Sequence, residues 1–340
     1  MIDRKARIPA GRYRSLTDAK EKADAVTRIV TLTMNPALDL TTSVDHLEPE
    51  AKLRCGPARF DPGGGGVNVA RVIRILGGTA VPIVAAGGIM GQAYRHRLDA
   101  EGLDYLLIPI AGDTRLSFTV SDGDAATQYR FVLPGPELRE AEWQACLDAL
   151  DGHMEEGGYV VASGSLPPGV PADFYARVAR QAKRHGARCI VDTSRAALAA
   201  ALDEGVFLVK PNRRELHDLT GLELADPAGQ AEAAMDLVRR GAAEIVALTL
   251  GAAGAVVASQ AGTLRIPAVA VEANSAVGAG DSFVGAMVHA LSEGRSLPEA
   301  ARHASAAGAA ALLTPATELC READVRRIER DLAALMGAAA

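Results

Sequence analysis

The sequence predicts an α/β fold: a doubly wound, mostly parallel sheet that carries a small antiparallel β-sheet lid. Short apolar runs alternate with stretches of helical periodicity along most of the chain. Glycine is frequent, with 34 residues, and aromatic residues make up only 4%, as expected where many tight turns join strands to helices. Two segments interrupt this rhythm with the polar–apolar alternation of half-buried antiparallel strands.

Strands are predicted where short apolar runs end at turn residues, over residues 28–33, 81–85, 105–110, 159–162, 188–191, 207–209, 244–248 and 268–271. Helices are predicted where apolar residues recur at i, i+3, i+4 and i+7, over residues 68–76, 172–185, 195–202, 231–240 and 281–291. Strand followed by helix, repeated, implies right-handed crossovers and therefore helices on both faces of the sheet.

The domain organisation follows from the same patterns. Residues 1–27 are polar with no clear apolar period and are predicted to form a poorly ordered extension. One domain is expected at 28–335, with lid segments inserted at about 38–60 and 113–134. Asp122-Gly123-Asp124 is a hairpin signal inside the second segment. Because such a sheet must bury one face and protect its edges, it could cover a ligand, pair with its own copy, or both.

Composition excludes several functions. The net charge is −6 and no basic block occurs, which argues against a nucleic-acid partner. No run approaches the ~18 consecutive apolar residues of a membrane span. The four cysteines, Cys55, Cys146, Cys189 and Cys320, are far apart and match no zinc spacing. They are expected to be reduced thiols of a cytoplasmic protein.

The segment Val-Gly-Ala-Gly-Asp-Ser-Phe at 277–283 is the most informative part of the chain. It opens the helix predicted at 281–291, so Gly278, Ala279 and Gly280 would present amides without intrahelical partners, where the helix dipole favours an anion. Asp281 in the first turn is the candidate general base beside the place where negative charge develops. The alternative is a glycine-rich turn with a capping Asp.

A second glycine-rich loop, Asp-Pro-Gly-Gly-Gly-Gly-Val-Asn at 61–68, precedes the helix at 68–76. Glycines allow positive φ and close approach of the backbone to a ligand, and Asn68 offers both a donor and an acceptor. Neither the dinucleotide fingerprint nor the P-loop motif is matched. We interpret Gly64, Gly65 and Asn68 as ligand contacts rather than parts of a flexible linker, because a linker would not abut an amphipathic helix.

Two further turns follow predicted strands, at the sheet edge where doubly wound folds bind ligands. Ser165, in the run 163–169, could hydrogen-bond a polar substrate. The turn at 249–254, with Thr249, Gly251 and Gly254, could approach a nucleotide through its backbone. A plain turn is the alternative for the run 163–169.

The run Val-Lys-Pro-Asn-Arg-Arg-Glu at 209–215 also ends a strand and opens a helix. Lys210 can act as a counter-charge to phosphate. Asn212 and Glu215 lie three residues apart on one helix face, and their oxygens suit a hydrated Mg²⁺ that bridges phosphates. The alternative is a capped, solvated helix start.

In this order and combination the motifs resemble the PfkB (ribokinase-like) family of sugar kinases. The resemblance covers about residues 28–323 and rests on the run 32–39 that ends at Asp39, on PGGGGVN, SGSLPPG, the N-x-x-E pair and VGAGDS. It implies a ribokinase-like fold whose β-sheet lid also builds a homodimer, and an ATP-dependent kinase of a sugar phosphate that uses Mg²⁺.

The resemblance also assigns the site. Asp281 would be the base, with the amides of Gly278, Ala279 and Gly280 as the anion hole. The sugar would be held by Asp39, Gly64, Gly65, Asn68 and Ser165, and its phosphate by Lys52, Arg54 and Arg115, which could reach across a dimer. ATP and Mg²⁺ would be held by Lys210, Asn212, Glu215, Thr249, Gly251 and Gly254.

Within the family the all-glycine run at 63–66 and the run 128–135 favour transfer to the 1-hydroxyl of fructose 6-phosphate, a step of glycolysis. The run Asn-Pro-Ala-Leu-Asp at 35–39 is instead typical of 1-phosphofructokinases, so fructose 1-phosphate and tagatose 6-phosphate are alternative acceptors. A non-catalytic sugar-phosphate sensor is the rival of another class.

Family members often place a monovalent-cation loop near residues 314–318. Here Pro315, Ala316 and Glu318 replace the glycine and basic residues of similar sequences. This departure argues against activation by K⁺, although ligation by backbone carbonyls needs no particular side chain.

Overall fold

The structure is a computed structural model that describes residues 27–124 and 127–338. The predicted N-terminal extension, residues 1–27, lies outside the described residues apart from Thr27. None of the described helices combines the length and apolar character that crossing a membrane requires.

A large sheet forms the centre of the described chain, with the strand order β13-β12-β11-β10-β9-β8-β1-β4-β5. Neighbours from β11 to β5 run parallel, whereas β12 and β13 extend the sheet antiparallel at one edge. The strands are β1 (Ile29–Thr33), β4 (Val81–Ala86), β5 (Leu106–Pro109), β8 (Tyr159–Ser163), β9 (Arg188–Asp192), β10 (Val206–Val209), β11 (Ala243–Thr249), β12 (Ala255–Ser259) and β13 (Gly262–Ile266).

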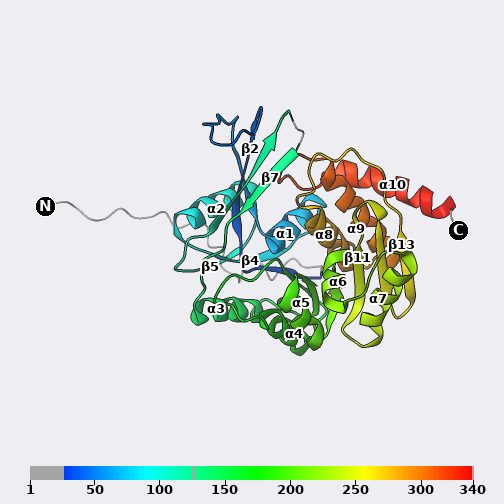
Figure 1. The fold of residues 1–340 in the computed structure, drawn as a ribbon. Coiled ribbons are helices and arrows are strands. Elements are labelled where there is room, and N and C mark those ends of the chain that lie inside the picture. The colour runs from blue at the N-terminus through cyan, green and yellow to red at the C-terminus, as the bar shows by residue number, and fades with distance from the viewer. Residues whose placement is uncertain (1–26, 125–126, 339–340) are drawn as a thin grey trace.

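Helices cover both faces of this sheet (Figure 1). One face packs against α1 (Gly65–Ile75), α8 (Ala279–Ser292), α9 (Leu297–Leu312) and α10 (Glu322–Ala338). The other packs against α3 (Glu140–Asp151), α4 (Phe174–Arg184), α5 (Arg195–Glu204), α6 (Arg213–Thr220) and α7 (Pro227–Arg239). Successive residues of β1 enter different cores, because side chains alternate across a strand: Ile29 packs on the first side and Val30 on the second. The helix α2 (Gly88–Glu101) packs beside β4 through Tyr94 and Leu98.

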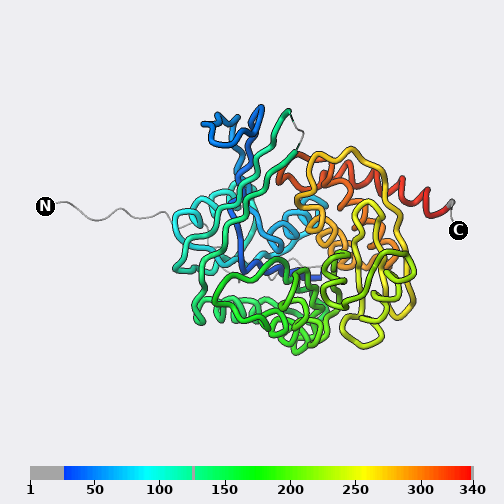
Figure 2. Tube along the Cα trace, in the orientation of Figure 1, coloured from blue at the N-terminus to red at the C-terminus, as the bar shows by residue number. Residues whose placement is uncertain are grey.

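A second sheet, β3-β2-β6-β7, stands at the carboxyl edge of the main sheet (Figures 1 and 2). Its strands are β2 (Ala37–Val44), β3 (Arg59–Gly63), β6 (Arg115–Asp122) and β7 (Thr127–Val132), and we call this sheet the lid. The predicted small sheet is confirmed. Its outer pairs are antiparallel, but the central pair β2–β6 runs parallel, since both strands continue from the carboxyl ends of parallel strands, β1 and β5.

One predicted strand is wrong. Residues 268–271 form no strand, and Val269 and Val271 are partly buried against the core that α1, α8, α9 and α10 share with the sheet. The alternation of valine with alanine in this segment therefore comes from side-chain packing of an irregular segment. It does not indicate a strand with backbone hydrogen bonds to a neighbour. The antiparallel strands β12 and β13 were not predicted, although the other predicted strands of the main sheet and the predicted helices are all present.

Candidate active site

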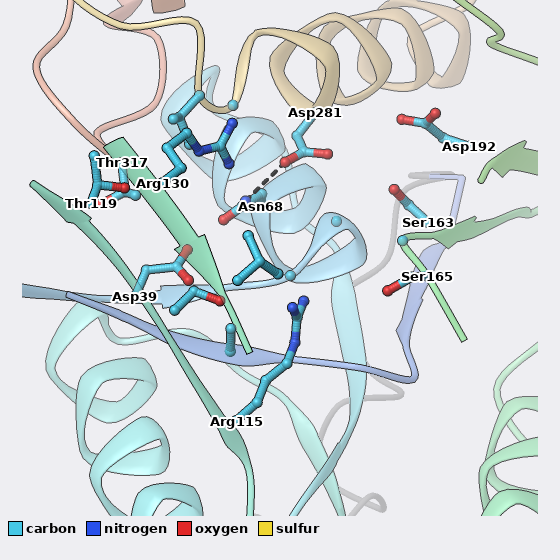
Figure 3. Close-up of a pocket in the computed structure, with 18 of the residues that line it drawn as sticks. Asp39, Asn68, Arg115, Thr119, Arg130, Ser163, Ser165, Asp192, Asp281 and Thr317 are labelled. Atoms are coloured by element: carbon cyan, nitrogen blue, oxygen red, sulfur yellow. Dashed lines mark hydrogen bonds between the residues drawn. The ribbon is translucent and has the colours of Figure 1, made fainter. Parts of the chain in front are cut away.

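A cavity of about 390 Å³ lies between the lid and the carboxyl edge of the main sheet (Figure 3). This is the edge at which open α/β sheets bind ligands. Many of the predicted site residues line it: Asp39, Gly64, Gly65, Asn68, Arg115, Ser165, Glu215, Gly278 and Asp281. The cavity is therefore the candidate active site.

The start of α8 forms one wall of this cavity. Gly278 precedes the helix with φ 76°, and the amide of Ser282 makes the first intrahelical bond, 2.8 Å to the Gly278 carbonyl. The amides of residues 279–281 are thus left without intrahelical acceptors, which makes an anion site. A Cβ on Gly278 would lie 2.7 Å from a methyl carbon of Leu319, so both the backbone angle and the packing require glycine there.

The carboxylate of Asp281 lies in the first turn of α8 and faces Asn68 (Figure 3). The Asn68 side-chain amide donates to Asp281 Oδ2 at 2.8 Å. Burial, together with the nearby charge of Asp192, raises the pKa of Asp281 to about 6, against the opposing effects of Asn68 and Lys210. A carboxylate with a pKa this close to neutrality is ionised at pH 7 and still basic enough to take a proton in catalysis.

Asp39, on β2, lies at the lid side of the cavity. Its carboxylate packs directly on Gly63, and a Cβ at position 63 would overlap it. The first glycine of the glycine-rich run therefore makes room for a protein carboxylate, whereas Gly64 and Gly65 face the cavity. Burial raises the pKa of Asp39 to about 7, although Arg115 and Arg130 both act to lower it.

Replacing Asp39 by Asn is expected to raise the melting temperature of the ligand-free protein, and to raise it more at pH 8 than at pH 5. Because the folded-state pKa is raised from the usual 3.8 to about 7, the destabilising effect of the Asp39 carboxyl is absent below pH 3.8, grows as the pH rises from there and is complete above pH 7. Thermal unfolding at both pH values measures this, with Asp331→Asn, on an exposed residue of α10, as the control. An equal effect of Asp39→Asn at both pH values would contradict the expectation.

Two arginines of the lid strands point into the cavity, Arg115 from β6 and Arg130 from β7 (Figure 3). Arg115 donates to the Asn35 carbonyl at 3.1 and 3.3 Å. Arg130 was not among the predicted site residues, although its alternation with apolar neighbours on β7 marks it as facing one side of the lid. Together the arginines supply the positive charge that an anionic group of a substrate needs.

Lys52 and Arg54 lie in the exposed loop between β2 and β3 and do not line the cavity of their own chain. Their predicted contact with a sugar phosphate therefore stays a prediction, and one that requires a second protomer. Ser165 does line the cavity, and its hydroxyl accepts a hydrogen bond from Asn35 at 3.0 Å.

Asp192, the last residue of β9, was missed by the sequence analysis. Its position directly after the strand predicted at 188–191 was the available signal, since ligands collect at such strand ends. Lys210 Nζ lies 3.1 Å from Asp192 Oδ1, and both side chains are largely buried. Burial lowers the pKa of Lys210, but the carboxylates of Asp192, Glu215 and Asp281 together more than offset this, so the pKa is raised. The ammonium lies 3.6 Å from the place a Cβ on Gly280 would take, so its charge stands beside the anion site.

Asn212 and Glu215 form a reciprocal cap at the start of α6. Asn212 Oδ1 accepts from the Glu215 amide at 2.9 Å, and Glu215 Oε2 accepts from the Asn212 amide at 2.8 Å. The capping role weighed as the alternative is thus present, yet Glu215 also lines the cavity. Its pKa is raised by burial.

The remaining predicted nucleotide residues lie next to this cap and outside the cavity lining. Thr249 pairs with Asn212 in an isolated bridge. Gly251 and Gly254 bound a short turn after β11, with φ 60° and 85°. Gly251 is exposed and Gly254 is half-buried, and contact of either with a nucleotide stays a prediction.

Within the described residues no group of three or more His, Cys, Asp or Glu side chains is arranged to hold a metal ion directly. Asp192 and Glu215 do present carboxylates to the same cavity. Two carboxylates beside an anion site fit Mg²⁺, which keeps several waters and binds proteins through one or two carboxylates plus substrate phosphates.

Comparison with known proteins identifies the class. The chain belongs to the pfkB family of carbohydrate kinases, whose family model matches residues 30–324. It is 49% identical over 300 residues to an ATP-dependent 6-phosphofructokinase isozyme 2 of Mycobacterium tuberculosis, a match that covers 88% of each chain. It is 42% identical over 302 residues to the isozyme 2 of Escherichia coli, with 88% of this chain and 97% of the other covered.

A relative from another branch is a 1-phosphofructokinase of Xanthomonas campestris, 35% identical over 310 residues, covering 88% of this chain and 93% of that protein. Among solved structures, the fold matches phosphofructokinase-2 from Escherichia coli in complex with fructose-6-phosphate. The TM-score is 0.86 at 40% identity, covering 90% of this chain and 99% of that one. These matches confirm the ribokinase-like fold.

Proposed function

We propose that this protein transfers the γ-phosphoryl group of ATP to the 1-hydroxyl of fructose 6-phosphate, giving fructose 1,6-bisphosphate and ADP. The observation that carries the proposal is the position of Asp281. A basic carboxylate stands at a helix start whose amides face the same cavity. Isozymes 2 of 6-phosphofructokinase at 49% and 42% identity support the choice of acceptor.

The geometry accounts for each part of the reaction. Asp281 takes the proton of the acceptor hydroxyl, whose oxygen forms the new bond to the γ-phosphorus while the bond to the bridging oxygen of ADP breaks. The electron pair of that bond leaves with ADP. The free amides at the start of α8, those of residues 279–281, and the ammonium of Lys210 stabilise the oxygens of the transferring group. Such transfer depends mainly on positioning and charge stabilisation, and this site offers both.

The remaining residues hold the reactants. Asp39, Asn68 and the backbone at Gly64 and Gly65 would bind the sugar hydroxyls. Arg115 and Arg130 would bind its phosphate. Asp192 and Glu215 would hold Mg²⁺ through water, and the ion when bound offsets the charge of the nucleotide phosphates.

Steady-state kcat/KM with MgATP, measured in parallel for fructose 6-phosphate, tagatose 6-phosphate and fructose 1-phosphate, tests the proposal. We expect a clear preference for fructose 6-phosphate. A preference for either other sugar would overturn the choice of acceptor, and no turnover with any of them would favour a sugar-phosphate sensor. The sensor is disfavoured because binding alone needs no base at position 281.

The alternative acceptor, fructose 1-phosphate, rests on the Asn-Pro-Ala-Leu-Asp run at 35–39 and on the 1-phosphofructokinase relatives. The contacts of Asn35 weaken this alternative. Its side chain donates to Ser165 and its carbonyl accepts from Arg115. Asn35 thus positions other site residues and does not line the cavity itself.

We further propose a homodimer through the lid. The strand β7 is exposed along its whole length and carries large apolar side chains, among them Tyr129 at 42% and Val132 at 61% exposure. An exposed apolar edge strand requires a partner. A second lid would cover it and would bring Lys52 and Arg54 towards the other protomer.

The exchange Tyr129→Asp is expected to convert the dimer into a monomer, because it places a charge in the apolar contact. Light scattering coupled to size exclusion measures the mass. The matched control is Leu222→Asp, an apolar residue after α6 that is somewhat more exposed, at 51%. A wild type that is monomeric, or a Tyr129→Asp variant that remains dimeric, would contradict the proposed interface.

A glycolytic role would place the protein in the cytoplasm. The expectation that K⁺ does not activate this protein stays a prediction. A solved structure of phosphofructokinase-2 from Escherichia coli is in complex with potassium. In this chain, however, the loop at 314–318 holds Ala316 at φ 56° where glycine would be unstrained. Activity with K⁺ exchanged for a tetraalkylammonium ion tests it.

A further inference from the structure

We propose that Arg71 and Glu101 are positioning residues for phosphoryl transfer, which fix the Asn68 side chain in the one orientation that serves Asp281. Neither residue carries a role in the site described above. The inference rests on the proposed function in taking Asp281 as the base. It holds for any acceptor sugar, because none of the contacts involves the acceptor.

Four side chains from three helices form a continuous series of hydrogen bonds. Glu101, the last residue of α2, accepts two bonds from Arg71 on α1, Nε to Oε2 and Nη2 to Oε1, both at 2.7 Å. Arg71 Nη1 donates to Asn68 Oδ1 at 3.1 Å. Asn68 Nδ2 then donates to Asp281 Oδ2 on α8 at 2.8 Å.

The chemistry of the groups gives this series a direction. A side-chain amide can rotate by half a turn and exchange its donor and acceptor ends. A guanidinium has only donors, so the oxygen of Asn68 must face Arg71 and its NH₂ must face Asp281. An ionised carboxylate has only acceptors, so Asp281 agrees with this orientation. With its Oδ2 held by Asn68, the other carboxylate oxygen is left to take the proton of the hydroxyl.

Burial makes Arg71 dependent on Glu101. Arg71 is only 8% exposed and Asn68 is also 8% exposed, and a buried guanidinium is costly unless it is paired. The bidentate contact with Glu101 holds the plane of the guanidinium. Arg71 Nη1 also reaches the Pro62 carbonyl at 3.3 Å, which ties the same group to the start of the glycine-rich run.

A purely structural role, joining α1 to α2, is the competing explanation. Arg74 provides a control that distinguishes the structural role from the positioning role. It lies one turn further along α1 and donates to the Glu101 backbone carbonyl, but it makes no hydrogen bond to Asn68. Loss of Arg74 removes a link between the same two helices. Loss of Arg71 removes such a link and also the constraint on Asn68.

The experiment compares Arg71→Met, Arg71→Gln, Arg71→Lys and Arg74→Met in the full-length protein by steady-state kinetics. We expect Arg71→Met to lower kcat by about 10- to 100-fold, the usual effect of losing a partner of a site residue, while KM for ATP changes little. Arg71→Gln can accept as well as donate, so it should be equally impaired. Arg71→Lys, a pure donor, should recover part of the loss, and Arg74→Met should match the wild type.

The pH dependence of kcat gives a second readout. Asp281 is faced by Asp192 from β9, Lys210 after β10, and Asn68 and Arg71 from α1. Arg71 is one of the charges that lower the pKa of Asp281. The acid limb of the kcat profile should therefore move to higher pH in Arg71→Met and stay in place in Arg74→Met.

Wild-type kcat and an unmoved acid limb in Arg71→Met would overturn the inference, as would equal losses in Arg71→Met and Arg74→Met. If Arg71→Met does not fold, the isosteric Glu101→Gln is measured instead, and an unaltered kcat there overturns the inference in the same way. Failure of the proposed function has a different signature. Turnover that survives in Asp281→Asn refutes the base itself, whereas an inactive Asp281→Asn with normal Arg71 variants refutes only the positioning role.

Discussion

Replacing Asp281 by Asn is expected to lower kcat by about 10²- to 10⁴-fold, the range that general base catalysis supplies. Asn keeps the shape of the side chain and can still meet Asn68, but it cannot take the proton of the acceptor hydroxyl. Binding of the sugar phosphate, measured by calorimetry without ATP, should change little. In the wild type, kcat should fall as pH drops through about 6, the pKa of Asp281.

The melting temperature of Asp281→Asn distinguishes a loss of catalysis from a loss of folding. The pKa of Asp281 is raised above its usual value, so the ionised carboxylate costs stability above pH 6. The Asn variant should therefore unfold at an equal or higher temperature than the wild type at pH 8. Full activity in Asp281→Asn would contradict the mechanism, and a lowered melting temperature would contradict the account of its environment.

Replacing Lys210 by Met is expected to lower the free energy of unfolding by about 3 kcal/mol, because it leaves one member of a buried ion pair unpaired. Asp192 would then stand beside Asp281 without its counter-charge, with 14% of its side chain exposed. Activity should also be lost, since the ammonium stands next to the amides of the anion site. Denaturant unfolding and kcat measure the two effects.

The double variant Asp192→Asn/Lys210→Met separates these effects. Removing both charges leaves no unpaired ion, so most of the lost stability should return. Turnover should not return, because the double variant still lacks the Lys210 ammonium beside the anion site and the Asp192 carboxylate in the cavity. If the double variant is no more stable than Lys210→Met alone, the pair does not contribute through its charges.

Much of the fold could be predicted because the apolar patterns of most strands and helices lie within short stretches of sequence. The apolar run of β1 and the spacing of apolar residues in α8 depend on short windows, and both elements lie where they were predicted. Residues 268–271 also alternate small and larger apolar residues, as a strand can, yet they form no strand. Their valine side chains pack against a core that is built from distant parts of the chain, which no local window contains.

The residues of the site also fall into those that lie in local motifs and those that only the assembled fold brings together. Asp281 and Asn68 lie in motifs whose backbone geometry is set by neighbouring glycines, so sequence was enough to predict them. Asp192 and Arg130 carry no such motif, and only the assembled sheets bring them to the cavity. The roles of Lys52 and Arg54 stay predictions, because neither residue lines the cavity of its own chain.

The central position of β1 has a consequence for how the chain acquires its structure. This strand pairs with β4, about fifty residues later, and with β8, whose Tyr159 stands opposite Ile29. During synthesis at about 5–20 residues per second, β1 waits roughly 10 s for its second neighbour to emerge. Contacts this distant in sequence slow folding, so the nascent N-terminal third, with its half-paired strand and exposed apolar faces, is where chaperone dependence and aggregation during expression should concentrate.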